Sequence, residues 1–275
     1  MEVIVRLAPL LVAAAGLLAS GCATQRAGDA AIDQALAASH RSAENRARDA
    51  SRHPRQTLQF FGVRPDMTVV EVWPGGGWYT EILAPLLKDR GRLYAANLDP
   101  AASEYARKTV DDFRAKLAAR PDVYGKVMVT TLAAPPASNQ IAPPGSADMV
   151  VTFRNLHNWM MFGWQREAFE AMHAALKPGG VLGVVEHRGD PKRPQDPKAA
   201  SGYVHEQYAI DLIESVGFKL VARSEVNANP RDTKDYEQGV WALPPTFAGG
   251  AANHDRFAAI GESDRFTLKF VKVAR

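Results

Sequence analysis

Short apolar runs rich in β-branched residues alternate with helix-like segments along most of this chain, and this alternation constrains its fold more than any other feature. The first run, TVVEVW at 68–73, is followed by apolar residues at helical spacing over 79–87. Strands that alternate with helices form a mostly parallel sheet that is covered on both faces. The pattern therefore predicts an α/β fold of this kind.

Seven runs have the length and composition of strands. The last two are not joined by a clearly periodic helix, which indicates an antiparallel edge strand. The expected strands are residues 68–73, 92–98, 127–132, 148–153, 181–186, 218–224 and 266–273, and the expected helices are 79–87, 99–117, 165–176 and 208–215.

A glycine-rich turn follows the first predicted strand. Ligands of open α/β sheets bind outside the carboxyl ends of the strands, so residues in such turns are candidate site residues. Here Glu71 lies near the strand end, and Pro74-Gly75-Gly76-Gly77 leads into a helix. Glycine lets a backbone approach a ligand closely, and a helix N-terminus offers free N–H groups to an anion. A plain structural turn has the same composition, so the turn alone does not decide the function.

Several segments together resemble one family. Glu71-x-x-x-Gly75-x-Gly77 resembles motif I of the class I S-adenosylmethionine-dependent methyltransferases, and residues 174–182 (AALKPGGVL) resemble the step before their fifth strand. Residues 146–151 and 217–220 are similar to their fourth and sixth strands. The resemblance covers roughly residues 56–273 and implies a Rossmann-like, seven-stranded sheet. More narrowly, residues 60–62, 71–80 and 154–157 look like a family of often exported bacterial methyltransferases.

The resemblance implies S-adenosylmethionine as the cofactor. Three positions depart from the family pattern: Trp73 replaces a usual glycine, Asn97 occupies the place of a ribose-binding acid, and Leu132 lies where an aspartate near the adenine amine is common. Asp99, two residues after Asn97, either takes over the ribose-binding role or only caps the next helix. The expected cofactor-binding residues are Glu71, Gly75, Gly77, Tyr79, Asn97, Asp99 and Arg154.

Polar residues follow the fourth and fifth predicted strands, where a methyl acceptor would lie. A base is needed when the acceptor is a hydroxyl or a protonated amine. We expect His157 or His205 to be that base, with Glu186 and Tyr203 positioning the substrate. The alternative is that these histidines only satisfy local hydrogen bonds. His157, Glu186, His187 and His205 include metal-ligating residue types, but no spacing is diagnostic, so no metal site is predicted.

The N-terminus reads as an export signal. Arg6 precedes an apolar run at 7–18, which is too short to span a bilayer, and small residues lead to Cys22. Residues 18–22 (LASGC) resemble a bacterial lipobox, although Ala19 stands where leucine is usual. We expect residues 1–22 to be a lipoprotein signal peptide, with a lipid anchor at Cys22 and a periplasmic, outer-membrane location.

Residues 23–51 are rich in Ala, Arg, Asp and Ser, which predicts a tether that becomes helical near 43–50. Residues 52–275 suit one methyltransferase-like domain. The net charge of +3, without a basic run, argues against a nucleic-acid partner, and the oligomeric state stays open.

Three functions are compatible with the sequence. The first is a methyltransferase acting on a small molecule in the cell envelope. The second is a non-catalytic periplasmic lipoprotein that binds a nucleoside-like or other small ligand. The third is an enzyme of this fold that carries out a different, metal-assisted reaction. The main objection to the first is that S-adenosylmethionine is made in the cytoplasm.

Overall fold

The computed structural model describes residues 28–137 and 139–273. The signal segment 1–22, Cys22 and residues 23–27 of the predicted tether lie outside the described residues. Among the helices that the structure describes, none has the length and apolar character to cross a membrane.

A seven-stranded sheet forms the centre of the molecule, with the strand order β3-β2-β1-β4-β5-β7-β6. Neighbouring strands from β3 to β5 pair in parallel, whereas β7 is antiparallel to both β5 and β6. This confirms the predicted Rossmann-like sheet. The strands are β1 (Thr68–Val72), β2 (Arg92–Asn97), β3 (Val127–Thr131), β4 (Ala147–Phe153), β5 (Leu176–His187), β6 (Phe218–Ser224) and β7 (Arg265–Lys272).

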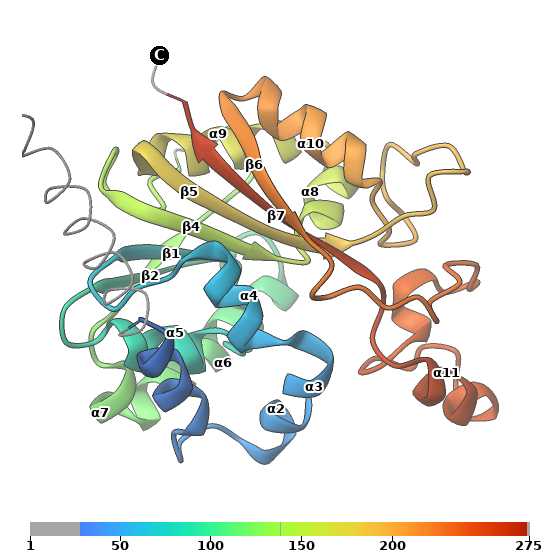
Figure 1. Ribbon diagram of the computed structural model, residues 1–275, viewed down its shortest axis with the longest axis horizontal. Coiled ribbons are helices and arrows are strands. Elements are labelled where there is room, and N and C mark those ends of the chain that lie inside the picture. Colours follow the sequence, from blue (N-terminus) through green and yellow to red (C-terminus); the bar gives the residue numbers. More distant parts are fainter. Residues whose placement is uncertain (1–27, 138, 274–275) are drawn as a thin grey trace, which may run out of the picture.

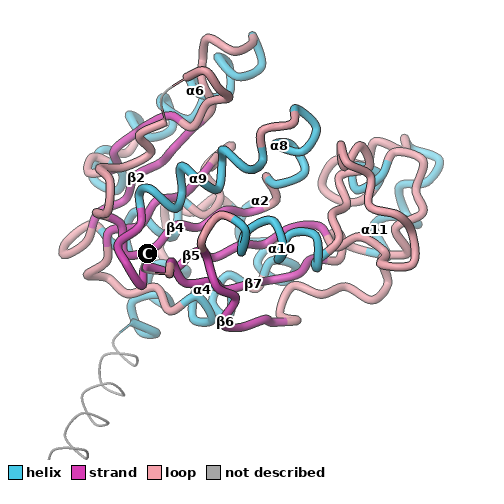
Figure 2. Tube along the Cα trace, turned by 90° about the horizontal axis from the view of Figure 1, so that it is seen from above, coloured by secondary structure: helices cyan, strands magenta, loops and turns pink. Residues whose placement is uncertain are grey.

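Helices cover both faces of the sheet (Figures 1 and 2). In Figure 1, α8, α9 and α10 lie above the sheet, and α4, α5 and α7 lie below it. The helices are α2 (Ala43–Ala47), α3 (Asp49–Arg52), α4 (Pro54–Phe61), α5 (Thr80–Leu87), α6 (Glu104–Ala119), α7 (Pro121–Tyr124), α8 (Leu156–Phe162), α9 (Gln165–Ala175), α10 (Glu206–Ser215) and α11 (His254–Ile260).

Strand β1 shows how the sequence pattern produces this layering. Its side chains alternate between the two faces, because successive residues of a strand point to opposite sides. Val70 and Val72 belong to the apolar cluster between the sheet and helices α8 and α9. Val69 belongs to the cluster on the other face, between the sheet and helices α4 and α5. Since both faces are buried, the strand is apolar almost throughout, and Glu71 is the exception.

The prediction of a tether is wrong for residues 28–37. Residues 28–37 form a helix, and its Ile32 and Ala35 are buried in the cluster beneath α4 and α5. Few large apolar residues are needed for this packing, because Ile32 alone supplies a fully buried side chain. Helices α2 and α3 then replace the single predicted helix near 43–50.

Two predicted boundaries also differ. Helix α6 begins at Glu104 rather than at Asp99, because the Asp99 carboxylate accepts a hydrogen bond from the backbone N–H of Ala101 and closes a turn. Ser103 then caps the helix by accepting from the N–H of Ala106 at 3.0 Å. Strand β5 is longer than predicted, since Leu176 already pairs with Ala147 of β4.

The connection from β6 to β7 is the least regular part of the fold. It contains the 3₁₀ helices η1 (Gly239–Ala242) and η2 (Ala251–Asn253), followed by α11. In Figure 1 this orange-red segment lies beyond the end of the sheet at which β4 and β5 terminate. The connection therefore supplies a wall for any site at the carboxyl ends of the strands.

Candidate active site

A cavity of about 410 Å³ lies at the carboxyl ends of β1, β4 and β5. Four parts of the chain line it: the α2–α3 segment, the turn after β1, the ends of β4 and β5 with the start of α8, and the segment from Val240 to Thr246 together with Glu262 and Ser263. This is the location that ligands prefer in open α/β sheets.

The glycine turn gives the cavity an open backbone wall. Gly75 and Gly76 line the cavity, and a Cβ added at either one would meet nothing within 4 Å. Gly75 has φ +56°, a conformation that glycine adopts without cost. Gly77 has a different role, because its missing Cβ leaves room for the ring of Phe113 at 3.1 Å. The structure thus places Gly75 on the cavity and Gly77 beneath the turn.

Glu71 is a buried acid at the base of this wall. It lines the cavity and accepts a hydrogen bond from the Thr80 hydroxyl at 2.6 Å. Burial raises its pKa to about 7. Near neutral pH the side chain is therefore partly protonated, so it can donate a hydrogen bond to a ligand as well as accept one.

Trp73 stands at the position where the family usually has glycine. Its φ of +48° is a left-handed conformation that is costly for a residue with a Cβ. Its indole N–H donates to the carbonyl of Leu132, beyond the end of β3, and its ring packs against Trp159 and Trp164 at centroid distances of 5.7 and 5.5 Å. This packing compensates for the strained backbone.

Asn97 and Asp99 do not line the cavity, whereas Trp73 does. The side chain of Asn97 is almost fully buried, and its Nδ2 has no hydrogen-bond partner among the described residues. Trp73 therefore bounds the cavity on the side of β2 and β3. The Asp99 carboxylate is occupied by its turn, which favours the capping role that the sequence left open.

Tyr79 and Arg154 meet the cavity near the end of β4. The Tyr79 ring stacks on Phe153, at the end of β4, with 3.5 Å between centroids and 9° between planes. Arg154 follows directly, with φ +62°, and its backbone N–H donates to the carbonyl of Val185 on β5. Both side chains line the cavity.

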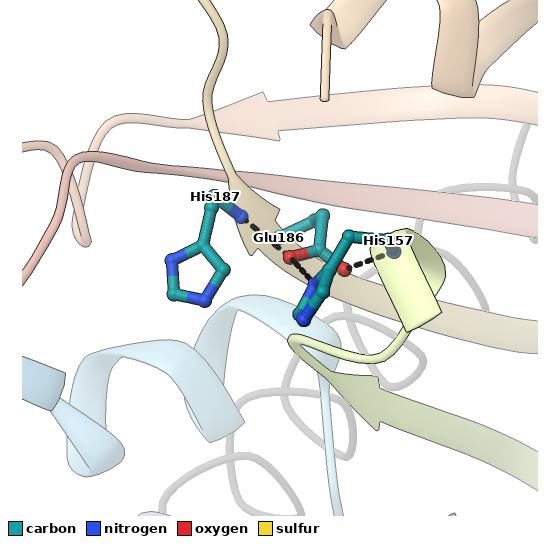
Figure 3. A group of neighbouring side chains, drawn as sticks. All are labelled: His157, Glu186 and His187. Carbon is teal, nitrogen blue, oxygen red and sulfur yellow. Dashed lines mark hydrogen bonds and ion pairs between the residues drawn. The ribbon is translucent and has the colours of Figure 1, made fainter. Parts of the chain in front are cut away.

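His157, Glu186 and His187 form a polar cluster (Figure 3), and the two histidines line the cavity. The fully buried Glu186 carboxylate accepts from the backbone N–H of His187 at 2.8 Å and of His157 at 3.3 Å, and lies 3.0 Å from His157 Nδ1. His187 Nδ1 lies 2.5 Å from the Ser263 hydroxyl. Burial and the neighbouring His157 lower the pKa of His187 well below its usual value, so its ring is neutral.

The two remaining predicted catalytic residues are not part of this cluster. Tyr203 is buried behind His187, and its hydroxyl donates to Asp232 at 2.8 Å. His205 lines a separate depression with Tyr203 and Asp190. The insertion that carries them crosses the end of β5 and places their side chains outside the main cavity.

Sequence reasoning missed the residues that the β6–β7 connection brings to the site. Glu262 accepts hydrogen bonds from Arg48, Arg52 and Arg265, and Trp241 lies 6.0 Å from the ring of His157. No local pattern links Glu262 to an arginine 214 residues away. His187 was already placed near the site by the sequence, since it follows Glu186 at the end of a predicted strand, although no catalytic role was predicted for it.

His157, Glu186 and His187 also each offer one metal-ligating atom, with these atoms within 4.8 Å of one another. The carboxylate, however, already accepts from two backbone N–H groups and faces His157 Nδ1. A metal ion would have to compete with these hydrogen bonds, so the geometry favours a carboxylate that orients an imidazole.

No protein-family model matches the chain. Its fold is similar to that of a SAM-dependent methyltransferase from Aquifex aeolicus (16% identity, TM-score 0.52, covering 82% of this chain and 93% of that one). It is also similar to that of the [4+2]-cyclase SpnF (14% identity, TM-score 0.55, covering 82% of each chain). A third similar fold is that of the S-adenosylmethionine-dependent methyltransferase SibL (13% identity, TM-score 0.50, covering 83% of this chain and 57% of that one). The chain therefore has the Rossmann-like fold of class I methyltransferases.

Proposed function

We propose that this protein is an S-adenosylmethionine-dependent methyltransferase that acts on a small molecule. The observation that carries the proposal is the cavity itself, in which an open glycine turn faces a histidine–carboxylate pair across the carboxyl ends of the strands. The fold alone does not determine the reaction, since one fold hosts many functions and SpnF is a cyclase.

The described residues fit the cofactor. Gly75 and Gly76 leave space for a ligand against the backbone, Glu71 offers a polar group there, and the buried Asn97 amide still has hydrogen-bonding capacity. When bound, S-adenosylmethionine supplies a methyl group on a sulfonium, and the electron pair of the broken carbon–sulfur bond stays on the sulfur. Tyr79 and Phe153 line the site, and binding of a nucleoside at Asn97 would require the Trp73 indole to move.

His157 is the proposed base. Its Nδ1 faces the Glu186 carboxylate, which fixes the ring and places the proton on Nδ1. Nε2 has no hydrogen bond to a described residue, so it is available to take the proton of an acceptor hydroxyl or amine as the new bond to the methyl carbon forms. The cavity walls would orient the acceptor against the base.

Transfer of a labelled methyl group from S-adenosylmethionine to small molecules of a cell-envelope extract tests this function. His157→Gln should lower the transfer at least about a hundredfold, since general bases contribute 10²–10⁴. Binding of S-adenosylhomocysteine should be unchanged in the same variant. Undiminished transfer would remove His157 from the mechanism.

A second function, binding of a small ligand without methyl transfer, is favoured by one observation. Trp73 bounds the cavity on the side of Asn97, so the space as it stands suits a ligand without a nucleoside. Absence of transfer with any extract, together with retained ligand binding, would support this alternative.

We also propose that the chain is exported and lipid-anchored at Cys22, on the sequence pattern of residues 6–22. Radioactive palmitate should label the wild-type chain and not a Cys22→Ser variant. Equal labelling of both would contradict the anchor.

A further inference from the structure

Four arginines surround a single carboxylate at the rim of the cavity. Glu262 is hydrogen-bonded to Arg48 at 2.8 Å, to Arg52 at 3.2 Å and to Arg265 at 3.0 Å, and lies 3.8 Å from Arg154. We call these five residues the arginine cluster. Its positive charges outnumber its negative charge, and an uncompensated buried charge is costly.

Members of the cluster differ in how far the protein satisfies them. Arg265 donates to Glu262, to the carbonyl of Ser263 and to the carbonyl of Ser51, so each nitrogen of its guanidinium makes a hydrogen bond. The Arg154 side chain, by contrast, donates no hydrogen bond to any described residue, is 25% exposed and lines the cavity. Its planar fork of N–H groups is therefore available to a ligand.

The cluster borders the histidines at which the acceptor would react. Burial foremost, and then the neighbouring His157 and the positive charge of Arg154, lower the pKa of His187. Burial, together with the charge of Arg154, also lowers the pKa of Arg52 to about 8. Both shifts have the direction expected where positive charge is in excess, and an anion bound between the arginines would offset it.

A bound cofactor would add no net negative charge to the cluster. S-adenosylmethionine is itself a net cation, because its sulfonium and ammonium outnumber its carboxylate. Glu71 contributes only part of a negative charge near neutral pH, since burial raises its pKa to about 7. A net anion for the cluster is therefore expected on the second substrate, although the family resemblance placed Arg154 among the cofactor-binding residues.

We propose that Arg154, supported by Arg52, binds a carboxylate or phosphate group of the methyl acceptor, so that the acceptor is an anionic small molecule. A guanidinium binds either group through two parallel hydrogen bonds. The acceptor role rests on the proposed methyltransferase function, whereas anion binding at the cluster does not.

Calorimetry on the purified full chain tests the proposal with succinate as the probe, succinamide as its neutral counterpart, and inorganic phosphate in a parallel titration. Succinate or phosphate should bind to protein saturated with S-adenosylhomocysteine, and succinamide should not. The anion with the lower dissociation constant shows whether the cluster prefers a carboxylate or a phosphate group. Arg154→Gln should weaken the binding at least tenfold, and Arg154→Lys, which keeps the charge, should restore part of it.

Arg92→Gln is the matched control, because Arg92 is exposed at the amino end of β2, the opposite edge of the sheet. It should leave anion binding unchanged, and thermal unfolding should show that each variant is folded. The proposal is overturned if neither anion binds, if Arg154→Gln binds as well as the wild type, or if the anion competes with S-adenosylhomocysteine. If S-adenosylhomocysteine itself does not bind, the methyltransferase function and the acceptor role fail, while titration of the free protein still decides whether the cluster binds anions.

Discussion

The Nδ1 atom of His157 lies 3.0 Å from Oε1 of Glu186, and this carboxylate is fully buried. It also accepts from the backbone N–H groups of His157 and His187, which join the start of α8 to the end of β5. The Glu186 side chain thus links the end of β5 to the start of α8, which carries the candidate base His157.

Removing this carboxylate should destabilise the fold. Glu186→Ala leaves buried N–H groups unpaired, and we expect the free energy of unfolding to fall by about 3 kcal/mol. Denaturant titration measures the loss. Glu170→Ala is the control, because Glu170 is an exposed residue of α9 paired with Arg166, and it should change stability by less than about 0.5 kcal/mol. Equal effects would show that Glu186 has no special structural role.

The buried Glu71 should make stability depend on pH. Its pKa is raised from 4.5 to about 7, so the folded state holds a proton that the unfolded state releases as the pH rises from 4.5 to 7. This stabilising contribution is therefore present below pH 4.5 and lost as the pH rises through 7. When the pH rises from about 4 to about 8, the free energy of unfolding of Glu71→Gln should increase by about 3 kcal/mol relative to that of the wild type, as measured by denaturant titration. If the free energies of unfolding of the two proteins changed in parallel with pH, the raised pKa of Glu71 would be contradicted.

Glu262 should behave in the opposite way. Although burial alone would raise its pKa, the surrounding arginines, Arg52 foremost, lower it to about 2. The stability that it contributes is present above pH 4.5 and lost as the pH falls towards 2. At neutral pH, Glu262→Gln should lower the free energy of unfolding by about 3–5 kcal/mol, because it leaves the buried arginines without their counter-charge. The difference in free energy of unfolding between this variant and the wild type should become smaller below pH 4.5. A difference that stays constant with pH would mean that the charge of Glu262 is not the cause of the destabilisation.

Trp73 should restrict access to Asn97. Trp73→Gly relieves the left-handed backbone and removes the indole, so we expect S-adenosylhomocysteine to bind at least fivefold more tightly in calorimetry. Thermal unfolding separates this effect from the packing lost against Trp159 and Trp164. Weaker binding by a folded variant would instead identify the indole as part of the ligand-binding surface.

The sequence allowed the sheet to be predicted because strand signals are local. The β-branched run of β1 and the glycine turn after it needed no distant information, and the structure places Glu71 and Gly75 at one cavity. The same holds for His157 and Glu186, which follow the ends of adjacent parallel strands.

The rest of the site depended on distant contacts. Glu262 and Trp241 reach the cavity from an irregular connection without periodicity, and Ile32 packs from a segment whose composition indicated a tether. Tyr203 and His205 were expected at the cavity because they follow β5, but the insertion directs Tyr203 to Asp232. Spacing along the chain gives no information on where such a loop folds.

Calorimetric titration of S-adenosylhomocysteine into the full chain tests the central claim most directly. We predict micromolar binding that is lost in Gly75→Val, because a branched side chain is strained at φ +56° and would project into the cavity. Gly145→Val is the control, since Gly145 has φ +64° and equally open surroundings but lies outside the cavity, and it should bind normally. No binding by the wild type at millimolar ligand would contradict the account and leave a methyltransferase fold that serves another ligand.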